Sequence, residues 1–294
     1  MSASTDLAPI RLTAGNSVFY VPERVAVEEG IFERHGVEIV TDAEWSARNH
    51  AIKDDEKDPV KLFDARRSDT FNMCEWGVLH RVEYAERDVR IVYLRPAVVA
   101  QALVTLDPTV QEPHDLIGRK VGINQSTGQH FTTIKLLEGA LTRDQIDLAH
   151  GGGPQELVDH LHEGTFGAVA LMEPFLSLAI KQGAHVLGSF FYRGAQAFGT
   201  DVPVEHQRRF IAAVNEAVDL INADPARYAA HVVEPTGGAL APEELSGDYH
   251  RYVHAQPYSQ ERFANQYSWL ESWDLVEGGR SYDQIIDPAA FATA

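Results

Sequence analysis

Apolar and polar positions follow two different spacings along the chain, and these spacings predict strands and helices in alternation. Short β-branched runs predict strands at residues 10–15, 37–42, 71–77, 89–96, 101–108, 120–124, 167–172 and 184–192. Apolar residues three or four positions apart predict helices at residues 21–36, 59–66, 132–141, 155–164 and 204–233, with another between residues 77 and 89 and a helical C-terminal region. This order indicates an α/β fold with largely parallel sheets.

Proline and glycine mark the expected helix ends. Pro22 lies in the first turn of the first helix and Gly36 follows its last turn. Gly164 is expected to stop one later helix, and Pro225 to interrupt the long helix at 204–233.

The elements fall into two α/β blocks, and the chain is expected to cross between them twice. The crossings are predicted at Arg95–Gln101 and at Ser189–Gln196. The first lobe would then comprise residues 1–98 and 193–294, with the second lobe, 99–192, inserted between them. Two lobes leave a cleft, where ligands are usually held.

Composition narrows the range of partners and locations. A net charge of −18 argues against nucleic acid and anionic membranes as general partners. Cys74 is the single cysteine and is expected to be a buried apolar side chain. No apolar run reaches about 18 residues, so membrane insertion is not expected. The N-terminus lacks a secretory signal, which predicts a cytoplasmic protein, or a periplasmic or extracellular one if a signal was trimmed.

Three stretches resemble the type II periplasmic-binding-protein superfamily. They are SVFYVPERVAVEEGIFERHGVEIV (17–40), PHDLIGRKVGINQSTGQHFTTIKLLEG (113–139) and FIAAVNEAVDLINADPARYAAHVV (210–233). The similarity is closest to the branch that holds sulfonate-, nitrate- and taurine-binding proteins and the thiamine-pyrimidine synthase group. The resemblance implies a two-lobed fold with a ligand cleft between the lobes.

Two enzymes of that superfamily are also similar to this chain. An ungapped alignment with the aromatic sulfinate desulfinase places Ser17 at its nucleophilic cysteine and His50 at its histidine. A decarboxylase of hydroxylated phthalates has a carboxylate where the segment CEWG, with Glu75, ends a strand. A serine without an adjacent base is a poor nucleophile, however.

The segment GINQSTGQH (122–130) is the strongest candidate for an anion site. A strand ends at Asn124, and Ser126 or Thr127 can cap the following helix. A helix start offers free backbone N–H groups and partial positive charge, which suit a carboxylate, sulfonate or phosphate. Gly128 lets the backbone approach a ligand. His130 either adds positive charge or is a surface residue. An ordinary helix cap without a ligand is the alternative.

Other candidates follow strand ends on either side of the cleft. Asn16 and Ser17 can donate hydrogen bonds to a ligand, unless Asn16 is a simple cap, and Phe19 or Tyr20 can stack on it. Glu75 beside Trp76 can act as a general acid or base, accept from a ligand amine, or pair with a local arginine. Met172 and Glu173 are candidates at a strand end of the second lobe. Trp45 and His50 are candidates in the polar connection 43–58, where the histidine can shuttle protons.

Metal and nucleotide chemistry find no support in the sequence. His160 and His162 are two positions apart on a helix and cannot share a face. The segment GGGPQE lacks the lysine and spacing of a phosphate loop. No metal or cofactor is expected.

Three functions fit these residues: a lyase, a solute-binding protein and a ligand-sensing module. The first is a cytoplasmic lyase, a decarboxylase or desulfinase acting on a small, aromatic acid, in which Ser126, Thr127 and Gly128 anchor the anion and Glu75 or His50 moves the proton. The alternative is a solute-binding protein that delivers a small organic anion to an ABC permease, without catalysis.

Overall fold

The computed structural model describes residues 8–13, 17–41 and 59–292. Strands β1 (Ala8–Leu12) and β2 (Val37–Thr41) form a small parallel sheet. A larger sheet has the order β3 (Thr70–Cys74), β8 (His185–Gly199), β4 (Val89–Thr105), β7 (Ala168–Leu171), β5 (Val121–Ile123) and β6 (Leu148–His150). Short strands β9 (His250–Tyr252) and β10 (Gln256–Pro257) also pair with β4.

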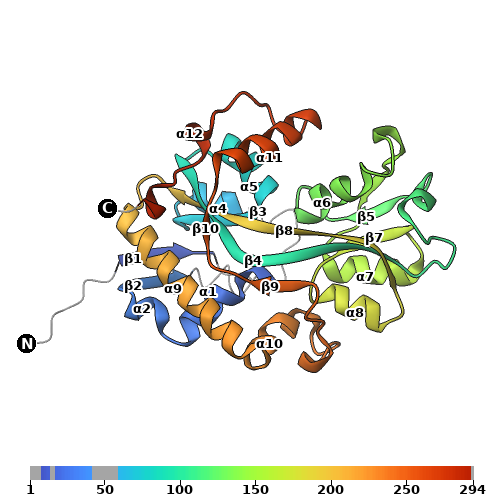
Figure 1. Ribbon diagram of the computed structural model, residues 1–294, viewed down its shortest axis with the longest axis horizontal. Coiled ribbons are helices and arrows are strands. Elements are labelled where there is room, and N and C mark those ends of the chain that lie inside the picture. Colours follow the sequence, from blue (N-terminus) through green and yellow to red (C-terminus); the bar gives the residue numbers. More distant parts are fainter. Residues whose placement is uncertain (1–7, 14–16, 42–58, 293–294) are drawn as a thin grey trace, which may run out of the picture.

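The larger sheet is mixed, so the prediction of largely parallel sheets is wrong. The neighbours β3, β8, β4 and β7 pair antiparallel in turn, and only β7, β5 and β6 pair in parallel. The difference comes from β4 and β8, which run in opposite directions through the middle of the molecule (Figure 1).

Strand β4 is one continuous strand where the sequence predicted two, at residues 89–96 and 101–108. Arg95 and Pro96 were expected to end one strand, yet the ladder continues to Thr105. Its register with β8 shifts between Leu94 and Val98, around Pro96. Proline is tolerated in a strand at such an irregularity because its missing N–H then breaks no regular ladder bond.

The helices are α1 (Val21–Glu28), α2 (Ile31–Arg34), α4 (Pro59–Asp64), α5 (Glu75–Tyr84), α6 (Gly128–Leu137), α7 (Pro154–Glu163), α8 (Phe175–Lys181), α9 (Val204–Ala223), α10 (Pro225–Val233), α11 (Gln260–Ser272) and α12 (Tyr282–Ile285). The ends expected at Gly164 and Pro225 are confirmed. The helix predicted at 21–36 is two helices, because Gly30 adopts a left-handed conformation (φ 64°) between them.

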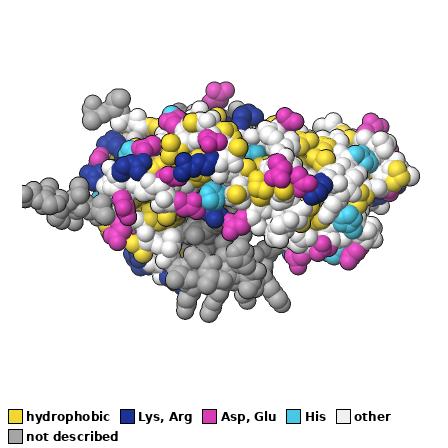
Figure 2. Space-filling model, turned by 90° about the horizontal axis from the view of Figure 1, so that it is seen from below, with side chains coloured by type: hydrophobic (Ala, Val, Ile, Leu, Met, Phe, Trp, Pro, Cys, Tyr) yellow, Lys and Arg dark blue, Asp and Glu magenta, His cyan; other side chains and the backbone are white. Residues whose placement is uncertain are grey.

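The molecule has two lobes joined by β4 and β8, which confirms the predicted two-lobed α/β fold (Figure 1). One lobe holds β1–β3, the helices α1, α2, α4, α5 and α9–α12, and the largest core; the other holds β5–β7 and α6–α8 around two smaller cores. The boundaries at 98/99 and 192/193 stay a prediction. Acidic side chains are scattered over the face seen in Figure 2, among basic and apolar ones.

The C-terminal end of α11 makes a polar contact with the second lobe, called here the α11 bridge. The indole N–H groups of Trp269 and Trp273 both donate to the Glu138 carboxylate, at 3.0 and 2.9 Å. Arg143 pairs with Asp274 at 2.9 Å and lies over the Trp273 ring. Lys135 Nζ lies 3.8 Å from the centroid of the Trp269 ring. These contacts join the lobes at a place other than the two connecting strands.

Removing the α11 bridge is expected to let the lobes separate further. The double variant Trp269→Ala/Trp273→Ala loses both indole donors and both cation–π contacts, each worth about 0.5–1 kcal/mol at exposed sites. Small-angle scattering of the ligand-free protein should therefore show a larger radius of gyration. Phe191→Ala is the matched control, because Phe191 is an exposed ring on β8 that contacts Arg251 of β9 and not the α11 bridge. Equal scattering from all three proteins would contradict the expectation.

Candidate ligand-binding site between the lobes

The start of α6 is organised by hydrogen bonds within its own loop. Thr127 is the N-cap, and its hydroxyl accepts from the Gln129 amide at 3.3 Å. The same hydroxyl donates to the Asn124 carbonyl at 2.7 Å, and the Gln129 side chain accepts from the Asn124 amide at 2.8 Å. The Thr127 hydroxyl therefore has no proton left for a ligand, contrary to the prediction. The first turn contains no acidic residue.

Ser126 precedes this cap and lines a pocket of about 300 Å³. Its φ of 62° is uncommon for a residue with a side chain, and such backbone strain concentrates at ligand sites. The pocket lies between α5, the start of α6 and the segment after α11, and is lined by His80, Tyr84, Ser126, His130, Phe131, Asp274, Leu275, Val276 and Glu277. It brings residues of both lobes together.

His130 lines this pocket, and the expectation that it adds positive charge gains no support. The side chain is half-buried, and burial, with a smaller effect of nearby His80, lowers its pKa below the usual value. Its Nδ1 atom is buried and has no hydrogen-bond partner in the described part of the chain. A neutral imidazole at this place can donate or accept one hydrogen bond toward a ligand.

Gly128 faces a side chain rather than open space. A Cβ atom at this position would collide with the hydroxyl of Tyr192, which comes from β8. The Tyr192 hydroxyl also lies 3.6 Å from the Met172 sulfur, at the end of β7. Glycine is therefore needed because the Tyr192 side chain approaches the helix start.

Aromatic rings from both lobes pack around Tyr192. The Phe19 and Tyr192 centroids are 5.4 Å apart, and the Trp76 and Tyr192 centroids 5.7 Å apart. Trp76 also contacts Phe131 of α6 at 6.4 Å, and it is 1% exposed. Phe19 and Trp76 are thus parts of a buried aromatic cluster, not open faces for a ligand ring. The remaining members of the cluster are Phe190 and Trp269.

Tyr20 lies away from this cluster. Its ring stacks on the guanidinium of Arg95, with 4.7 Å between the ring centroid and Cζ. Arg95 is itself buried and is bound by Asn72 at 2.9 Å and Glu23 at 2.5 Å. The predicted stacking of Tyr20 on a ligand is replaced by stacking on this arginine.

Glu75 is held in an ion pair rather than poised as an acid or base. It lies directly after the end of β3, in the first turn of α5, and is 2% exposed. Two nitrogens of Arg262 each donate to its carboxylate at 2.7 Å, and Tyr258 donates at 3.2 Å. The expected arginine partner is present, although it comes from α11 and not from the local sequence.

The neighbouring Cys74 is buried and caps α5 by accepting from the Gly77 amide at 3.2 Å. Burial raises the pKa of its thiol to about 12, so the thiol stays protonated at neutral pH. This confirms the expectation of a buried apolar side chain.

Glu173 turns toward α8 instead of the cleft. It accepts hydrogen bonds from the Ser177 hydroxyl at 2.7 Å and the Ser177 amide at 3.2 Å, and is 1% exposed. Burial outweighs these bonds and raises the pKa of the carboxyl to about 7. Of the two residues expected at this strand end, only Met172 lies beside the aromatic cluster.

Ser17 is half-buried just before a short 3₁₀ helix, and its hydroxyl forms no cap bond there. Asn16, Trp45 and His50 lie outside the described residues. Among the predicted residues, Phe19, Trp76, Gly128 and Met172 therefore meet around Tyr192, and Ser126 and His130 share the pocket.

Sequence reasoning missed Tyr192, Arg262, Trp269 and Lys135. Tyr192 belongs to the run SFFYRG, which was treated only as a strand end. The aromatic spacing in QYSWLESW was interpreted as packing, and the structure adds that Trp269 packs across the lobes. No side-chain cluster within residues 8–13, 17–41 and 59–292 is arranged to hold a metal ion. Over the same ranges, every helix is too short or too polar to cross a membrane.

The ion pair of Glu75 is expected to stabilise the fold. Glu75→Gln leaves the partly buried Arg262 without its charge partner, which should lower the free energy of unfolding by about 2–3 kcal/mol. Urea unfolding measures this change. Arg24→Gln is the control, because Arg24 forms ion pairs that are exposed and should change stability by less than about 1 kcal/mol. Equal stability of Glu75→Gln and the wild type would contradict this role.

Glu173 is expected to make stability depend on pH. Its pKa is higher in the folded chain, about 7, than the 4.5 of a free side chain, so the folded state binds more protons between these values. Stability should fall as pH rises from about 4.5 to 7, by on the order of 1–3 kcal/mol. Glu173→Gln should remove this part of the dependence in thermal melts recorded across that range. An unchanged pH profile in the variant would show that other groups cause it.

Comparison with known proteins shows similarity at the level of structure. No protein-family model matches the chain, and neither does any curated protein sequence. Solved structures match over nearly the whole length. The periplasmic aliphatic sulphonate-binding protein SsuA from Escherichia coli has a TM-score of 0.74 at 17% identity, covering 95% of this chain and 97% of that chain.

Two further structures show the same likeness. The alkanesulfonate-binding protein SsuA from Xanthomonas axonopodis pv. citri, bound to MOPS, has a TM-score of 0.70 at 15% identity and covers 97% of this chain and 98% of that chain. The periplasmic nitrate-binding protein NrtA from Synechocystis PCC 6803 has a TM-score of 0.73 at 11% identity and covers 97% and 88%. The resemblance to the two enzymes gains no support. The chain therefore has the two-lobed type II periplasmic-binding-protein fold that its sequence predicted.

Proposed function

We propose that this protein is a solute-binding protein that holds a small organic anion, a sulfonate or a carboxylate, between its lobes. The observation that carries the proposal is the start of α6. In a chain with a net charge of −18, its first turn has no acidic residue and faces the other lobe. The structures similar to this chain include proteins named for binding sulfonates and nitrate.

The groups at this helix start suit an anion. The amides of Gly128 and His130 have no acceptor among the described residues, and neither does the Ser126 hydroxyl. Backbone N–H groups at a helix start and the helix dipole together favour negative charge. Asp274 also lines the pocket, but its carboxylate pairs with Arg143 at 2.9 Å.

The proposed role includes a permease partner and a location outside the cytoplasm. A binding protein of an importer meets its solute outside and delivers it to an ABC permease. This replaces the cytoplasmic location expected from the N-terminal sequence. The proteins from Escherichia coli and Synechocystis that this chain resembles are described as periplasmic.

The lyase hypothesis loses most of its chemistry among the described residues. Glu75 is bound by Arg262, and the Cys74 thiol stays protonated. The Ser17 hydroxyl forms no cap bond to the 3₁₀ helix that follows it. We therefore assign no bond-breaking step to the cleft.

A charge placed before α6 tests the anion site. Isothermal titration of the wild type with ethanesulfonate, benzoate and nitrate should find saturable binding of at least one. Ser126→Asp should weaken that binding at least tenfold, because about 1.4 kcal/mol of repulsion corresponds to this factor. Ser126→Asn is the matched control: it has nearly the same shape, tolerates the left-handed backbone and carries no charge.

The control should bind within about twofold of the wild type, a difference of roughly 0.4 kcal/mol. Two results would count against the proposal. One is that none of the three anions binds. The other is that the aspartate and asparagine variants bind equally well.

A further inference from the structure

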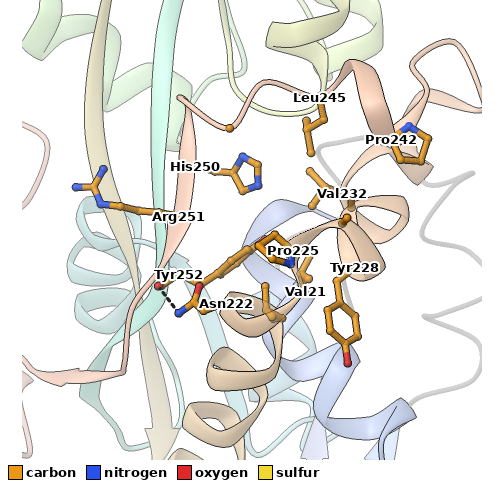
Figure 3. A pocket seen from close by; sticks show the side chains of 14 residues that line it. Val21, Asn222, Pro225, Tyr228, Val232, Pro242, Leu245, His250, Arg251 and Tyr252 are labelled. Carbon is orange, nitrogen blue, oxygen red and sulfur yellow. Dashed lines mark hydrogen bonds between the residues drawn. The ribbon is translucent and has the colours of Figure 1, made fainter.

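A second pocket, of about 390 Å³, lies on a different part of the molecule from the start of α6 (Figure 3). It is enclosed by α1, the end of α9, α10, the segment 242–247 and β9. The lining residues are Val21, Ile221, Asn222, Pro225, Ala226, Tyr228, Ala229, Val232, Pro242, Leu245, Gly247, His250, Arg251 and Tyr252. None of them lines the pocket beside Ser126.

No charged group of the lining points into this pocket. Arg251 is its one charged residue, and the side chain points away from the pocket in Figure 3, with its guanidinium 5.0 Å from the Phe191 ring centroid. The Tyr228 hydroxyl also points away and donates to Glu29 at 3.2 Å. A charged ligand would lose its hydration here without gaining a partner, so the pocket disfavours ions.

Two side chains bring polar groups to this pocket. Asn222 donates through Nδ2 to the Tyr252 carbonyl at 3.1 Å, and His250 is the second. Its ring projects from β9 toward Leu245, Val232 and Pro225 (Figure 3). The Nδ1 atom is buried and has no hydrogen-bond partner in the described part of the chain. Burial lowers the pKa of the ring, so it is neutral at pH 7. A buried polar atom without a partner costs about 1–3 kcal/mol, which a bound group can recover.

We propose that this pocket binds a small, uncharged, mostly apolar molecule with one hydroxyl group, which hydrogen-bonds to Nδ1 of His250. A hydroxyl both donates and accepts, so it satisfies either tautomer of the neutral imidazole. The volume is sufficient, because an apolar cavity of about 150 Å³ already holds benzene. It also falls within the range of roughly 300–1,000 Å³ that is usual for small-molecule pockets.

Hydrogen bonds connect the wall of this pocket to the neighbourhood of two predicted ligand-binding residues, Ser17 and Glu173. Tyr252 in its wall donates to the Val18 carbonyl at 3.0 Å, next to Ser17. Ser246, between two segments of its lining, donates through its amide to the Ser177 hydroxyl at 3.1 Å, and that hydroxyl is bound to Glu173. The wall of the pocket is therefore hydrogen-bonded to both lobes.

Titration with phenol tests the proposal, and toluene, which lacks the hydroxyl, is the comparison ligand. Binding is followed in ¹H–¹⁵N NMR spectra of the full chain. Phenol should shift the amides of α10 and β9 in a saturable way and bind more tightly than toluene. His250→Phe should weaken phenol binding roughly fivefold, the factor expected for one hydrogen bond, and leave toluene binding unchanged.

Blocking variants complete the test. Ala229→Trp fills the pocket and should abolish phenol binding, whereas Ala230→Trp, exposed on the same helix outside the lining, should not. If Ala229→Trp does not fold, Ala226→Trp replaces it, because Ala226 lines the pocket with an exposed side chain. Absence of saturable phenol binding would overturn the proposal and leave an ordered water as the partner of His250. Equal binding of toluene and phenol, or binding that survives the blocking variants, would overturn it too.

The anion titration described above, repeated on Ala229→Trp, separates the two sites. The variant should bind the anion as the wild type does. Phenol binding without any anion binding would contradict the proposed function alone, and anion binding without phenol binding would contradict the second pocket alone.

Discussion

The antiparallel pairing of β4 with β8 is the constraint on which the remaining structure depends. The two strands run through both lobes, and their register shifts around Pro96, where the regular ladder is interrupted. Carbonyl groups at such an irregularity need other donors. Arg193 supplies them from β8, donating to the carbonyls of Arg95 at 2.7 Å and Leu94 at 3.2 Å, and to that of His254 at 3.0 Å. One buried guanidinium thus holds together the two connecting strands and the C-terminal segment at the point where the chain passes between lobes.

The position of this crossing decides which side chains meet between the lobes. Tyr192 is the residue before Arg193, and it points to the start of α6 and to Trp76. The aromatic cluster therefore forms where the strands pass from one lobe to the other, and it fills space that a larger ligand would need. The α11 bridge adds contacts at Glu138 and Arg143. Both features favour a compact arrangement of the lobes without a ligand, which leaves room for a small guest rather than a large one.

Much of the fold was predictable because local signals act within a few residues. Gly164 and Pro225 end or divide helices through their own backbone geometry, and both positions were correct. Segments 89–96 and 101–108 were separated wrongly because Arg95 and Pro96 look like a strand end, while the compensating donor, Arg193, is 98 residues away. The same limit applies to the site. Glu75 was identified as a candidate acid or base or as the partner of a local arginine, but its partner Arg262 is 187 residues distant. The role of Thr127 as a cap follows from its spacing, whereas the collision that requires Gly128 depends on Tyr192 of another strand.

The acidic surface does not prevent an anion from binding at α6. Charges farther away than about 8 Å are largely screened at physiological ionic strength, so the net charge of −18 acts weakly on a guest between the lobes. What counts is the set of groups in contact with it. At the start of α6 these are amides and the hydroxyl of Ser126. Two carboxylates, Asp274 and Glu277, also line the pocket, and the charge of Asp274 is balanced by Arg143. Burial lowers the pKa of His130, so this ring adds no positive charge at neutral pH. Under the proposed function, such a site would distinguish anions by the geometry of their oxygens more than by the strength of their charge.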